Sequence, residues 1–324
     1  MKAIVYEKYG PPDALQLTEM EKPTPKDDEV LIKVHAASVN DWDWGYLQGK
    51  PFINRMLNGL RRPKIRILGC DVAGKIEAVG KNVNQFQPGD EVYGDLCEDG
   101  FGGFAEYTCA RETSLTLKPE NMTFEQAAAI PQAGMLAVQG LRDKKQLQPG
   151  NKILINGAGG GVGTFGVQIA KLLGVEVTGV DSTEKLDMMR SLGFDHVIDY
   201  TKEDFTKNGQ QYDLILDNKM YHSIFDYKRA LSPNGMYITA GGSMTRVFLA
   251  FLFGPLITLF SKKKIGILVL KANKDLAYMN ELFMEGKVKP VIDGSYSLRE
   301  VPEAFRYFGE GKHKGKIVIT VAQD

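Results

Sequence analysis

The stretch Lys-Ile-Leu-Ile-Asn-Gly-Ala-Gly-Gly-Gly-Val-Gly, residues 152–163, decides the fold of this chain. An apolar strand enters a run of glycines, and an amphipathic helical segment, 164–173, follows directly. This order is typical of a pyrophosphate site, because glycines let the backbone approach phosphates and the helix start supplies free N–H groups. Ala158, Gly160 and Gly163 form an Ala-x-Gly-x-x-Gly variant of the dinucleotide fingerprint. A plain glycine-rich loop is the alternative.

A second apolar strand, 176–180, follows the helix and ends in Asp181. Asp181 lies 18 residues after the last glycine of the turn, about where an acidic side chain meets the adenosine ribose. The sequence therefore predicts that Asp181 binds a dinucleotide cofactor together with five residues of the turn: Ala158, Gly160, Gly161, Val162 and Gly163.

Composition and charge narrow the class of protein. A chain of 324 residues with 43% hydrophobic content is long enough for two domains with substantial cores. Forty basic residues balance forty acidic ones, so no net field attracts nucleic acid. The stretch 1–10 lacks the apolar core of a signal peptide. Cys70, Cys97 and Cys109 are odd in number and lack metal-type spacing, which is typical of reduced thiols in the cytoplasm.

The pattern along the chain changes near residue 123. Before it, turn formers separate short alternating runs, which predict an irregular β-barrel: 30–35, 72–79, 91–93 and 105–109. After it, a helical run extends to about residue 145, and strands and helices then alternate: 152–156, 161–173, 176–180, 184–192, 196–199, 214–217, 224–231 and 236–239. This alternation predicts an α/β fold with a doubly wound parallel sheet and helices on both faces. A turn-rich piece ends in the strand 316–321.

With these patterns, the chain resembles the medium-chain dehydrogenase/reductase superfamily, and within it the zinc-free quinone oxidoreductase branch. Besides the glycine turn, the landmarks are Ala37-Ser38-Val39-Asn40 with Asp43, Gly69-Cys70-Asp71-Val72-Ala73-Gly74, Val79-Gly80, Pro88-Gly89-Asp90-Glu91-Val92, Gly103-Phe104-Ala105-Glu106-Tyr107, Val197-Ile198-Asp199-Tyr200 and Gly315-Lys316-Ile317-Val318. Each motif is weak alone, but their order and spacing are specific. The resemblance implies a GroES-like β-barrel catalytic domain, 1–123 completed by 272–324, packed against a Rossmann domain, 124–271, with the active site in the cleft.

The metal ligands of the resembled family argue against zinc in this chain. Zinc-dependent relatives place a cysteine where this chain has Asn40, and a His-Glu pair where it has Cys70-Asp71. An amide is a poor zinc ligand, and one thiol and one carboxylate leave a metal short of the three protein ligands that a catalytic site needs. We therefore predict no metal site and expect Cys70 to be a packed barrel thiol.

Without a metal, hydrogen-bond donors have to polarise the substrate carbonyl. By the resemblance, the Asn40 amide sits near the nicotinamide ribose and the substrate oxygen; a turn-capping asparagine is the alternative. Tyr46, in the same loop, is the second candidate donor, and its alternative is a ring packed at a pocket mouth. Many relatives carry a threonine that touches the nicotinamide where this chain has Leu136, so that hydrogen bond cannot form here.

The residues disagree on the choice between NADH and NADPH. Asp181 would accept hydrogen bonds from a free ribose 2′-hydroxyl and repel a 2′-phosphate. Ser182, Lys185 and Tyr200 occupy positions that resemble the 2′-phosphate contacts of NADPH-using relatives. The alternatives are a solvated lysine at 185 and a partly buried ring at 200. The predicted cofactor is therefore NAD(P)H, with the choice open.

Two later strand ends complete the predicted cofactor site. Asp217 ends the fourth Rossmann strand, and Gly241 and Gly242 follow the fifth, where doubly wound sheets bind their ligands. The segment Asn218-Lys219-Met220 replaces the small glycine-rich loop of many relatives, so the inference from family resemblance is weakest there.

Residues 247–260 form a strongly apolar run with Gly254-Pro255 in the middle and Lys262-Lys263-Lys264 after it. Fourteen residues interrupted by a proline are too short to span a bilayer, for which about 20 are needed. We expect a buried substrate lid or a dimer contact, and the resemblance implies a homodimer. The alternative is a surface helix in peripheral contact with a membrane or a lipophilic substrate.

The sequence thus predicts an enzyme with a small-molecule substrate. It would be a zinc-independent, NAD(P)H-dependent oxidoreductase that transfers hydride to a quinone or to an α,β-unsaturated carbonyl, with Asn40 and Tyr46 as catalytic residues. One alternative is an aldehyde or ketone reductase of the alcohol dehydrogenase type. The other is a low-turnover NAD(P)H-binding regulatory protein, because a fold does not fix a function.

Overall fold

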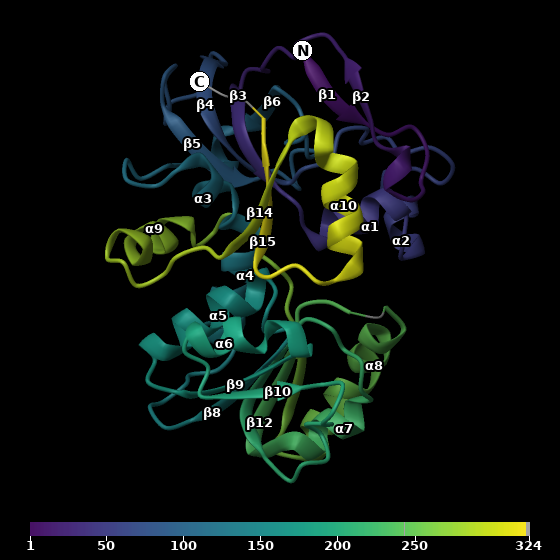
Figure 1. Cartoon of the computed structure of the whole chain (residues 1–324), viewed down its shortest axis with the longest axis vertical. Coiled ribbons are helices and arrows are strands. Elements are labelled where there is room, and N and C mark those ends of the chain that lie inside the picture. Colours follow the sequence, from purple (N-terminus) through teal and green to yellow (C-terminus); the bar gives the residue numbers. More distant parts are fainter. Residues whose placement is uncertain (243, 322–324) are drawn as a thin grey trace. The chain divides into compact units, whose positions relative to one another are not determined.

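The computed structural model describes residues 1–242 and 244–321, and the chain divides into two compact units. The first comprises Met1–Gln132, Ala272–Met284 and Pro290–Asp324, and the second Ala133–Lys271 with Glu285–Lys289. The first unit therefore extends beyond residue 123, where the sequence placed the boundary. The expected helical run to residue 145 is two helices, α3 (Phe124–Ala128) and α4 (Pro131–Leu141), as Figure 1 shows. A proline cannot continue a preceding helix, which explains the break.

The first unit is built on a seven-stranded sheet in the order β14-β15-β3-β4-β5-β7, with β6 also paired to β3. All pairs are antiparallel except β14 with β15. A separate hairpin joins β1 to β2. Besides α3, the helices and strands of this unit are β1 (Lys2–Val5), β2 (Gln16–Glu19), β3 (Glu29–Ser38), α1 (Asp41–Gln48), α2 (Phe52–Asn58), β4 (Asp71–Val79), β5 (Glu91–Asp95), β6 (Tyr107–Arg111), β7 (Thr116–Leu117), α9 (Leu276–Met284), β14 (Ile292–Ser297), α10 (Val301–Glu310) and β15 (Lys316–Thr320).

Strand β3 is the centre of this sheet, because it pairs with β4, β6 and β15. Its last residue, Ser38, lies opposite Asp71 on β4 and opposite Val318 on β15. Gly74 permits the close approach of β4, since a Cβ atom there would lie 2.2 Å from the Lys33 carbonyl oxygen. The polar residues that follow β3 and begin β4 and β15 are therefore brought to one place in the barrel.

The second unit contains a six-stranded, fully parallel sheet in the order β10-β9-β8-β11-β12-β13. This is the strand order of dinucleotide-binding domains, in which successive strands are added to one side of β8 and then, from β11 on, to its other side. Besides α4, its elements are β8 (Lys152–Asn156), α5 (Gly161–Leu172), β9 (Glu176–Asp181), α6 (Leu186–Ser191), β10 (His196–Asp199), β11 (Tyr212–Asp217), α7 (Ile224–Ala230), β12 (Leu231–Thr239), α8 (Met244–Phe260) and β13 (Lys264–Ile267).

Helices cover both faces of this sheet, as the alternating pattern predicts. Leu154 lies in one core cluster with residues of α7 and α8, including Tyr227 and Ile257. The next residue of β8, Ile155, faces the other way and lies against Gly166 of α5, where a Cβ atom would be 2.9 Å from its Cδ1. Helices α7 and α8 pack against each other on their face of the sheet (Figure 1). A doubly wound sheet results.

The apolar run 247–260 lies within α8, which also contains Pro255. Ala250 and Ile257 point into the core, whereas Phe251 and Leu259 are 70% and 75% exposed. One side of the expected lid or dimer contact is therefore buried and the other side is exposed. Among the described residues, no helix is long and apolar enough to cross a membrane.

The C-terminal piece that the sequence describes only as turn-rich contains two helices, α9 and α10. Helix α10 buries Val301, Ala304 and Phe305 along one side and ends at Gly311, whose φ of 68° is left-handed. Its apolar residues have helical spacing, but the helix is only ten residues long. This helix was missed because so short an amphipathic segment is hard to distinguish from turns.

Candidate cofactor and active site

The glycine turn between β8 and α5 forms the first part of the site. A Cβ atom on Gly163 would lie 2.3 Å from the Ala158 carbonyl oxygen, so this glycine lets α5 pack on the turn. Among the described residues, a Cβ atom on Gly160 would come within 4 Å of the Gly157 oxygen alone, at 3.5 Å. Protein packing therefore does not require glycine at 160. The open space there fits a pyrophosphate that approaches the backbone.

The start of α5 supplies hydrogen-bond donors beside this space. Gly160 is the N-cap of α5 and has no side chain to cap the helix. The N–H groups of Gly161, Val162 and Gly163 have no partner within the helix, because the first turn of any helix lacks acceptors for them. With the positive end of the helix dipole, they are suited to bind an anion. The structure thus brings together the turn residues that the sequence predicts.

Asp181, at the end of β9, is held against this turn. Its Oδ2 accepts a hydrogen bond from the Gly159 N–H at 2.8 Å, and its Oδ1 accepts one from the Ser182 N–H at 2.9 Å. The Lys185 ammonium lies 3.5 Å from Asp181 Oδ1, and both side chains are almost completely buried. Lys185 is therefore not a solvated surface lysine. The two residues that favour opposite cofactors form one buried ion pair.

Ser182 and Tyr200 flank this ion pair. Ser182 is partly exposed, and the Tyr200 side chain is 55% exposed. The Tyr200 N–H donates to the Asp181 carbonyl oxygen at 3.2 Å, which places the two strand ends side by side. The alternative of a partly buried ring at 200 is compatible with this exposure, although β10 ends one residue before Tyr200. Both side chains are open to a ligand.

Both carboxylate oxygens of Asp217, at the end of β11, accept hydrogen bonds from protein donors. Its Oδ1 accepts from Asn156 Nδ2 at 2.8 Å. The same oxygen accepts from the backbone N–H groups of Lys219 and Met220, each at 2.9 Å. Its Oδ2 accepts from the Tyr237 hydroxyl at 2.9 Å. We infer that Asp217 supports a cofactor by shaping the turn after β11 rather than by contacting it.

Gly241 and Gly242, after β12, lie beside that turn and differ from each other. Gly242 has a φ of 109°, and a Cβ atom there would lie 2.6 Å from the Cβ of Met220. Among the described residues, a Cβ atom on Gly241 would approach only the Asn218 oxygen, at 3.6 Å. Packing therefore requires glycine at 242, whereas Gly241 leaves room for a ligand.

A second group of polar side chains is buried in the first unit, where β3, β4 and β15 come together. This polar cluster consists of Ser38, Asn40, Asp43, Cys70, Asp71, Asp95, Gln132 and Lys316. Asn40 Nδ2 donates to the Ser38 carbonyl oxygen at 3.3 Å and to Asp71 Oδ2 at 3.0 Å. Asn40 Oδ1 accepts from the Lys316 ammonium. Both ends of the Asn40 amide are engaged inside the protein, so it can bind a substrate only by exchanging one of these bonds.

Burial raises the pKa of the acidic groups in the polar cluster, because a low-dielectric surrounding disfavours their charged forms. It raises the pKa of Asp43 to about 7, although the Gly69 N–H donates to this carboxyl at 2.8 Å. It raises the pKa of Asp95 to about 7, and the nearby Asp71 adds to the effect. Burial also raises the pKa of the Cys70 thiol well above its usual range. Cys70 is therefore a neutral, packed thiol at physiological pH.

Tyr46 lies on α1, which begins directly after Asn40. Its side chain is 7% exposed and packs against Phe101, with ring centroids 4.9 Å apart. Burial raises the pKa of the Tyr46 hydroxyl, so it is protonated at neutral pH. Among the residues that the structure describes, no hydrogen bond reaches this hydroxyl. Of the two predicted donors, Tyr46 is thus the one with an unengaged donor group.

Comparisons with known proteins agree with this architecture. Residues 26–120 match the family of alcohol dehydrogenase GroES-like domains, and residues 192–319 match the zinc-binding dehydrogenase family. The quinone-oxidoreductase QR1 of Triphysaria versicolor is 35% identical over 98% of this chain and 98% of that protein. The chain belongs to the medium-chain dehydrogenase/reductase superfamily. Its predicted α/β fold, with a GroES-like and a Rossmann part, is confirmed.

Two further members of this superfamily cover nearly the whole chain. The NADPH-dependent alkenal/one oxidoreductase of Arabidopsis thaliana is 35% identical over 98% of this chain and 79% of that protein. The structure of the quinone oxidoreductase from Coxiella burnetii superposes with a TM-score of 0.87, at 28% identity and over 99% of both chains. The chain is therefore an oxidoreductase of the quinone oxidoreductase branch, in a family that depends on NAD(P)H.

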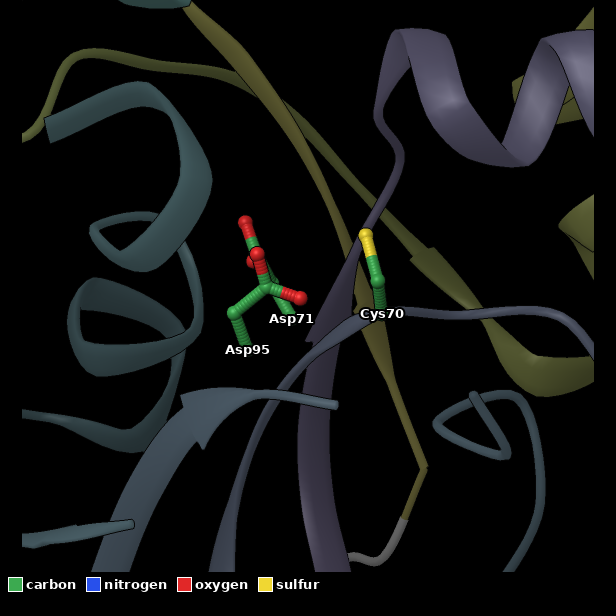
Figure 2. A group of neighbouring side chains, drawn as sticks. All are labelled: Cys70, Asp71 and Asp95. Atoms are coloured by element: carbon green, nitrogen blue, oxygen red, sulfur yellow. The ribbon is translucent and has the colours of Figure 1, made fainter. Parts of the chain in front are cut away.

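Because the superfamily also contains zinc enzymes, the polar cluster has to be compared with a metal site. Figure 2 shows Cys70, Asp71 and Asp95 where β4 begins and β5 ends, and one ligand atom of each lies within 4.8 Å of the others. However, the Lys316 ammonium lies 3.4 Å from Asp71 Oδ2. The Asn40 amide N–H group also faces the Cys70 sulfur, at 3.3 Å. Because a buried cation already pairs with Asp71 and an N–H donor faces the Cys70 sulfur, this donor set does not fit zinc.

Of the eight members of the polar cluster, only Asn40 was predicted as a site residue, and the others include Gln132 and Lys316. The backbone N–H of Gln132 donates to Asp71 Oδ1 at 3.1 Å, and Lys316 pairs with the other oxygen of the same carboxylate. Lys316 belongs to the motif 315–318, which is one of the landmarks of the superfamily. This motif was the sequence signal that could have identified Lys316 as a site residue. A lysine that begins a strand usually points to solvent, so neither charge nor spacing reveals that this one is buried.

Proposed function

We propose that this member of the superfamily transfers a hydride from NAD(P)H to a quinone or to the β-carbon of an α,β-unsaturated carbonyl. The observation that carries the proposal is the glycine turn at the reversal of strand order between β8 and β11, where Gly160 leaves space beside the open N–H groups of α5. The end-to-end likeness to quinone and alkenal/one oxidoreductases supports the substrate class. When bound, the nicotinamide supplies the hydride, and the protein supplies orientation and hydrogen bonds.

The proposed roles of the catalytic residues follow from charge development. As a C–H bond forms at the β-carbon, an electron pair moves to the carbonyl oxygen, which then needs a donor and finally a proton. The Tyr46 hydroxyl is protonated and unengaged, so we assign this donation to Tyr46 first. Asn40 is the second candidate, because its amide would have to release Asp71 or the Ser38 carbonyl to reach a substrate.

Oxidation of NADH and NADPH, followed with a panel of quinones and enones, tests the proposal. We expect turnover with at least one quinone or enone. Turnover confined to saturated aldehydes and ketones would favour the alcohol dehydrogenase-type alternative. Nucleotide binding without turnover on any of these compounds would favour the regulatory alternative, for which the leucine at 136 and the Lys219 turn are the supporting features.

Zinc independence is part of the proposal. We expect purified protein to contain no stoichiometric zinc and chelators to leave its activity unchanged, because the Lys316 ammonium already neutralises the Asp71 carboxylate. Elemental analysis of the protein, before and after dialysis against a chelator, measures this. One zinc ion per chain that is lost together with activity would contradict the expectation.

We also expect the pair Asp181 and Lys185 to set the choice of cofactor. Asp181→Ser removes a carboxylate that repels a 2′-phosphate, and should raise kcat/KM for NADPH relative to NADH. Lys185→Ala removes the attracting ammonium and should shift the ratio the other way. Lys207→Ala, at a lysine that is 71% exposed, is the control. A ratio unchanged in both variants would show that the 2′ position does not meet this pair.

We also propose an oligomeric state, a membrane contact and a cellular location for this protein. A homodimer rests on the resemblance to this branch. A peripheral membrane contact through 247–260 is supported by the exposed Phe251 and Leu259 and by the exposed Lys262 and Lys264 just beyond α8. A cytoplasmic location is supported by the three unpaired cysteines. Analytical sedimentation measures the oligomeric state, and flotation with anionic vesicles measures the membrane contact.

A further inference from the structure

Lys316 is a buried cation at the start of β15, with a side chain only 4% exposed. Its ammonium donates to Asn40 Oδ1, to the Val39 carbonyl oxygen at 3.4 Å and to Asp71 Oδ2 at 3.4 Å. A lysine ammonium has three N–H donors, so all three are used inside the protein. A charge this deeply buried is costly unless it is paired, and the fully buried Asp71 carboxylate is its partner.

The ammonium also decides which way the Asn40 amide faces. Asn40 Oδ1 is directed at Lys316, and Asn40 Nδ2 is directed at Asp71 Oδ2. A half-turn of the amide would set its N–H donors against the ammonium and its oxygen against the carboxylate. Both contacts repel, so Lys316 and Asp71 together allow a single orientation.

The backbone of Asn40 begins the helix that carries Tyr46, because its N–H donates to Asp43 Oδ2 at 3.0 Å and its carbonyl accepts from the Trp44 N–H at 3.1 Å. The Lys316 ammonium holds this backbone one residue earlier, through the Val39 carbonyl oxygen. We propose that Lys316 is a positioning residue whose ammonium supplies a positive charge beside Cys70, Asp71 and Asp95, a group that could otherwise hold a metal ion. It orients Asn40 directly and Tyr46 through α1. The positioning part of this inference, that Lys316 orients the catalytic groups, rests on the proposed function. The electrostatic part, that the ammonium keeps a metal ion out of the polar cluster, does not.

The electrostatic part is tested without any assay of activity. Lys316→Met keeps the length of the side chain and removes its charge, which leaves Cys70, Asp71 and Asp95 without the ammonium. We expect this variant to bind one Co²⁺ per chain at least ~10-fold more tightly than the native chain, with the absorption of a cobalt–thiolate bond. Lys312→Met, at a lysine that is 58% exposed, should behave like the native chain. No gain in Co²⁺ affinity in folded Lys316→Met would overturn this part.

The positioning part is tested by separating turnover from binding. Lys316→Met should lower kcat by ~10², the effect of a small misplacement of catalytic groups, while the Kd for NADPH changes little. Lys316→Arg keeps the charge and should restore part of kcat and none of the Co²⁺ binding. A native kcat in Lys316→Met, or a loss of NADPH affinity as large as the loss of kcat, would overturn the positioning role.

A double variant keeps the test valid if Lys316→Met does not fold. Lys316→Met with Asp71→Asn removes both charges of the buried pair, so no unpaired charge is left in the core. We expect a folded protein with a low kcat, because Asn40 Oδ1 has still lost its donor. A native kcat in this folded double variant would overturn the proposal. If the native chain reduces neither quinones nor enones, the proposed function fails, and the Co²⁺ result alone decides the role of Lys316.

Discussion

Gly160→Val is expected to lower the affinity for NADH and NADPH by orders of magnitude and to leave the fold intact. The branched side chain would fill the space through which a pyrophosphate approaches the backbone of the turn. It would not disturb the protein, because the nearest described atom to its Cβ is 3.5 Å away and the φ of −88° suits any residue. Isothermal titration with each nucleotide, together with a thermal melt, measures both effects.

Two other glycines serve as matched controls for this variant. Gly163→Ala should lower the melting temperature, because its Cβ would lie 2.3 Å from the Ala158 carbonyl oxygen. Gly266→Val, on the edge strand β13, should change neither stability nor binding, since its Cβ would lie 3.7 Å from the flexible end of Met236. A folded Gly160→Val protein that binds nucleotides like the native chain would show that the site lies elsewhere.

Tyr46→Phe is expected to lower kcat by ~10² or more, the usual effect of losing one donor to a developing oxyanion. The phenylalanine ring keeps the packing against Phe101, so nucleotide affinity and stability should change little. Steady-state kinetics with a quinone and an enone, beside a titration with NADPH, separate the two effects. The raised pKa of the hydroxyl keeps Tyr46 protonated at neutral pH, so the native enzyme should lose no activity there through its ionisation.

Variants of Asn40 distinguish the second candidate donor from the first. If Asn40 donates instead, Asn40→Ala should lower kcat while Tyr46→Phe leaves it unchanged. Asn40→Asp should be at least as damaging, because it adds a carboxylate beside Asp71 and replaces a donor by an acceptor. Native kcat in all three variants would exclude both residues and direct attention to Lys219 or a bound water.

The second unit was predicted well because its signals are local. The expected strands 152–156 and 196–199 coincide with β8 and β10, since buried parallel strands appear as short apolar runs between helices. The glycine turn also has a local cause, because its conformation depends on residues that lack side chains. The boundary between the units, in contrast, depends on contacts between residues that are distant in sequence. Residues 124–132 belong to the first unit because α3 packs against β3 and β4, which are distant in sequence.

The residues predicted to bind the cofactor also show the difference between local signals and contacts with distant residues. The sequence identifies Asp181 by its distance from the turn, and Lys185 by the resemblance to NADPH-using relatives, but it does not show that they pair with each other. Asp217 ends β11, as predicted, but the sequence did not show that four protein donors bind its carboxylate. A position along a strand predicts where a side chain is, and the neighbouring strands decide what it contacts.

The sequence alone determined that this chain has a glycine turn between a strand and a helix, followed by an alternating parallel sheet, and it predicted that this turn binds a dinucleotide. It also provided the candidates Asn40 and Tyr46. Only the tertiary structure decided that Asn40 is engaged at both ends, that the Tyr46 hydroxyl is unengaged and that Lys316 is buried beside Asp71. The physical reason is distance along the chain. The pairing of β3 with β4 and β15 brings together residues such as Asn40 and Lys316, which lie 276 positions apart, and the cost of burying a charge then selects their partners.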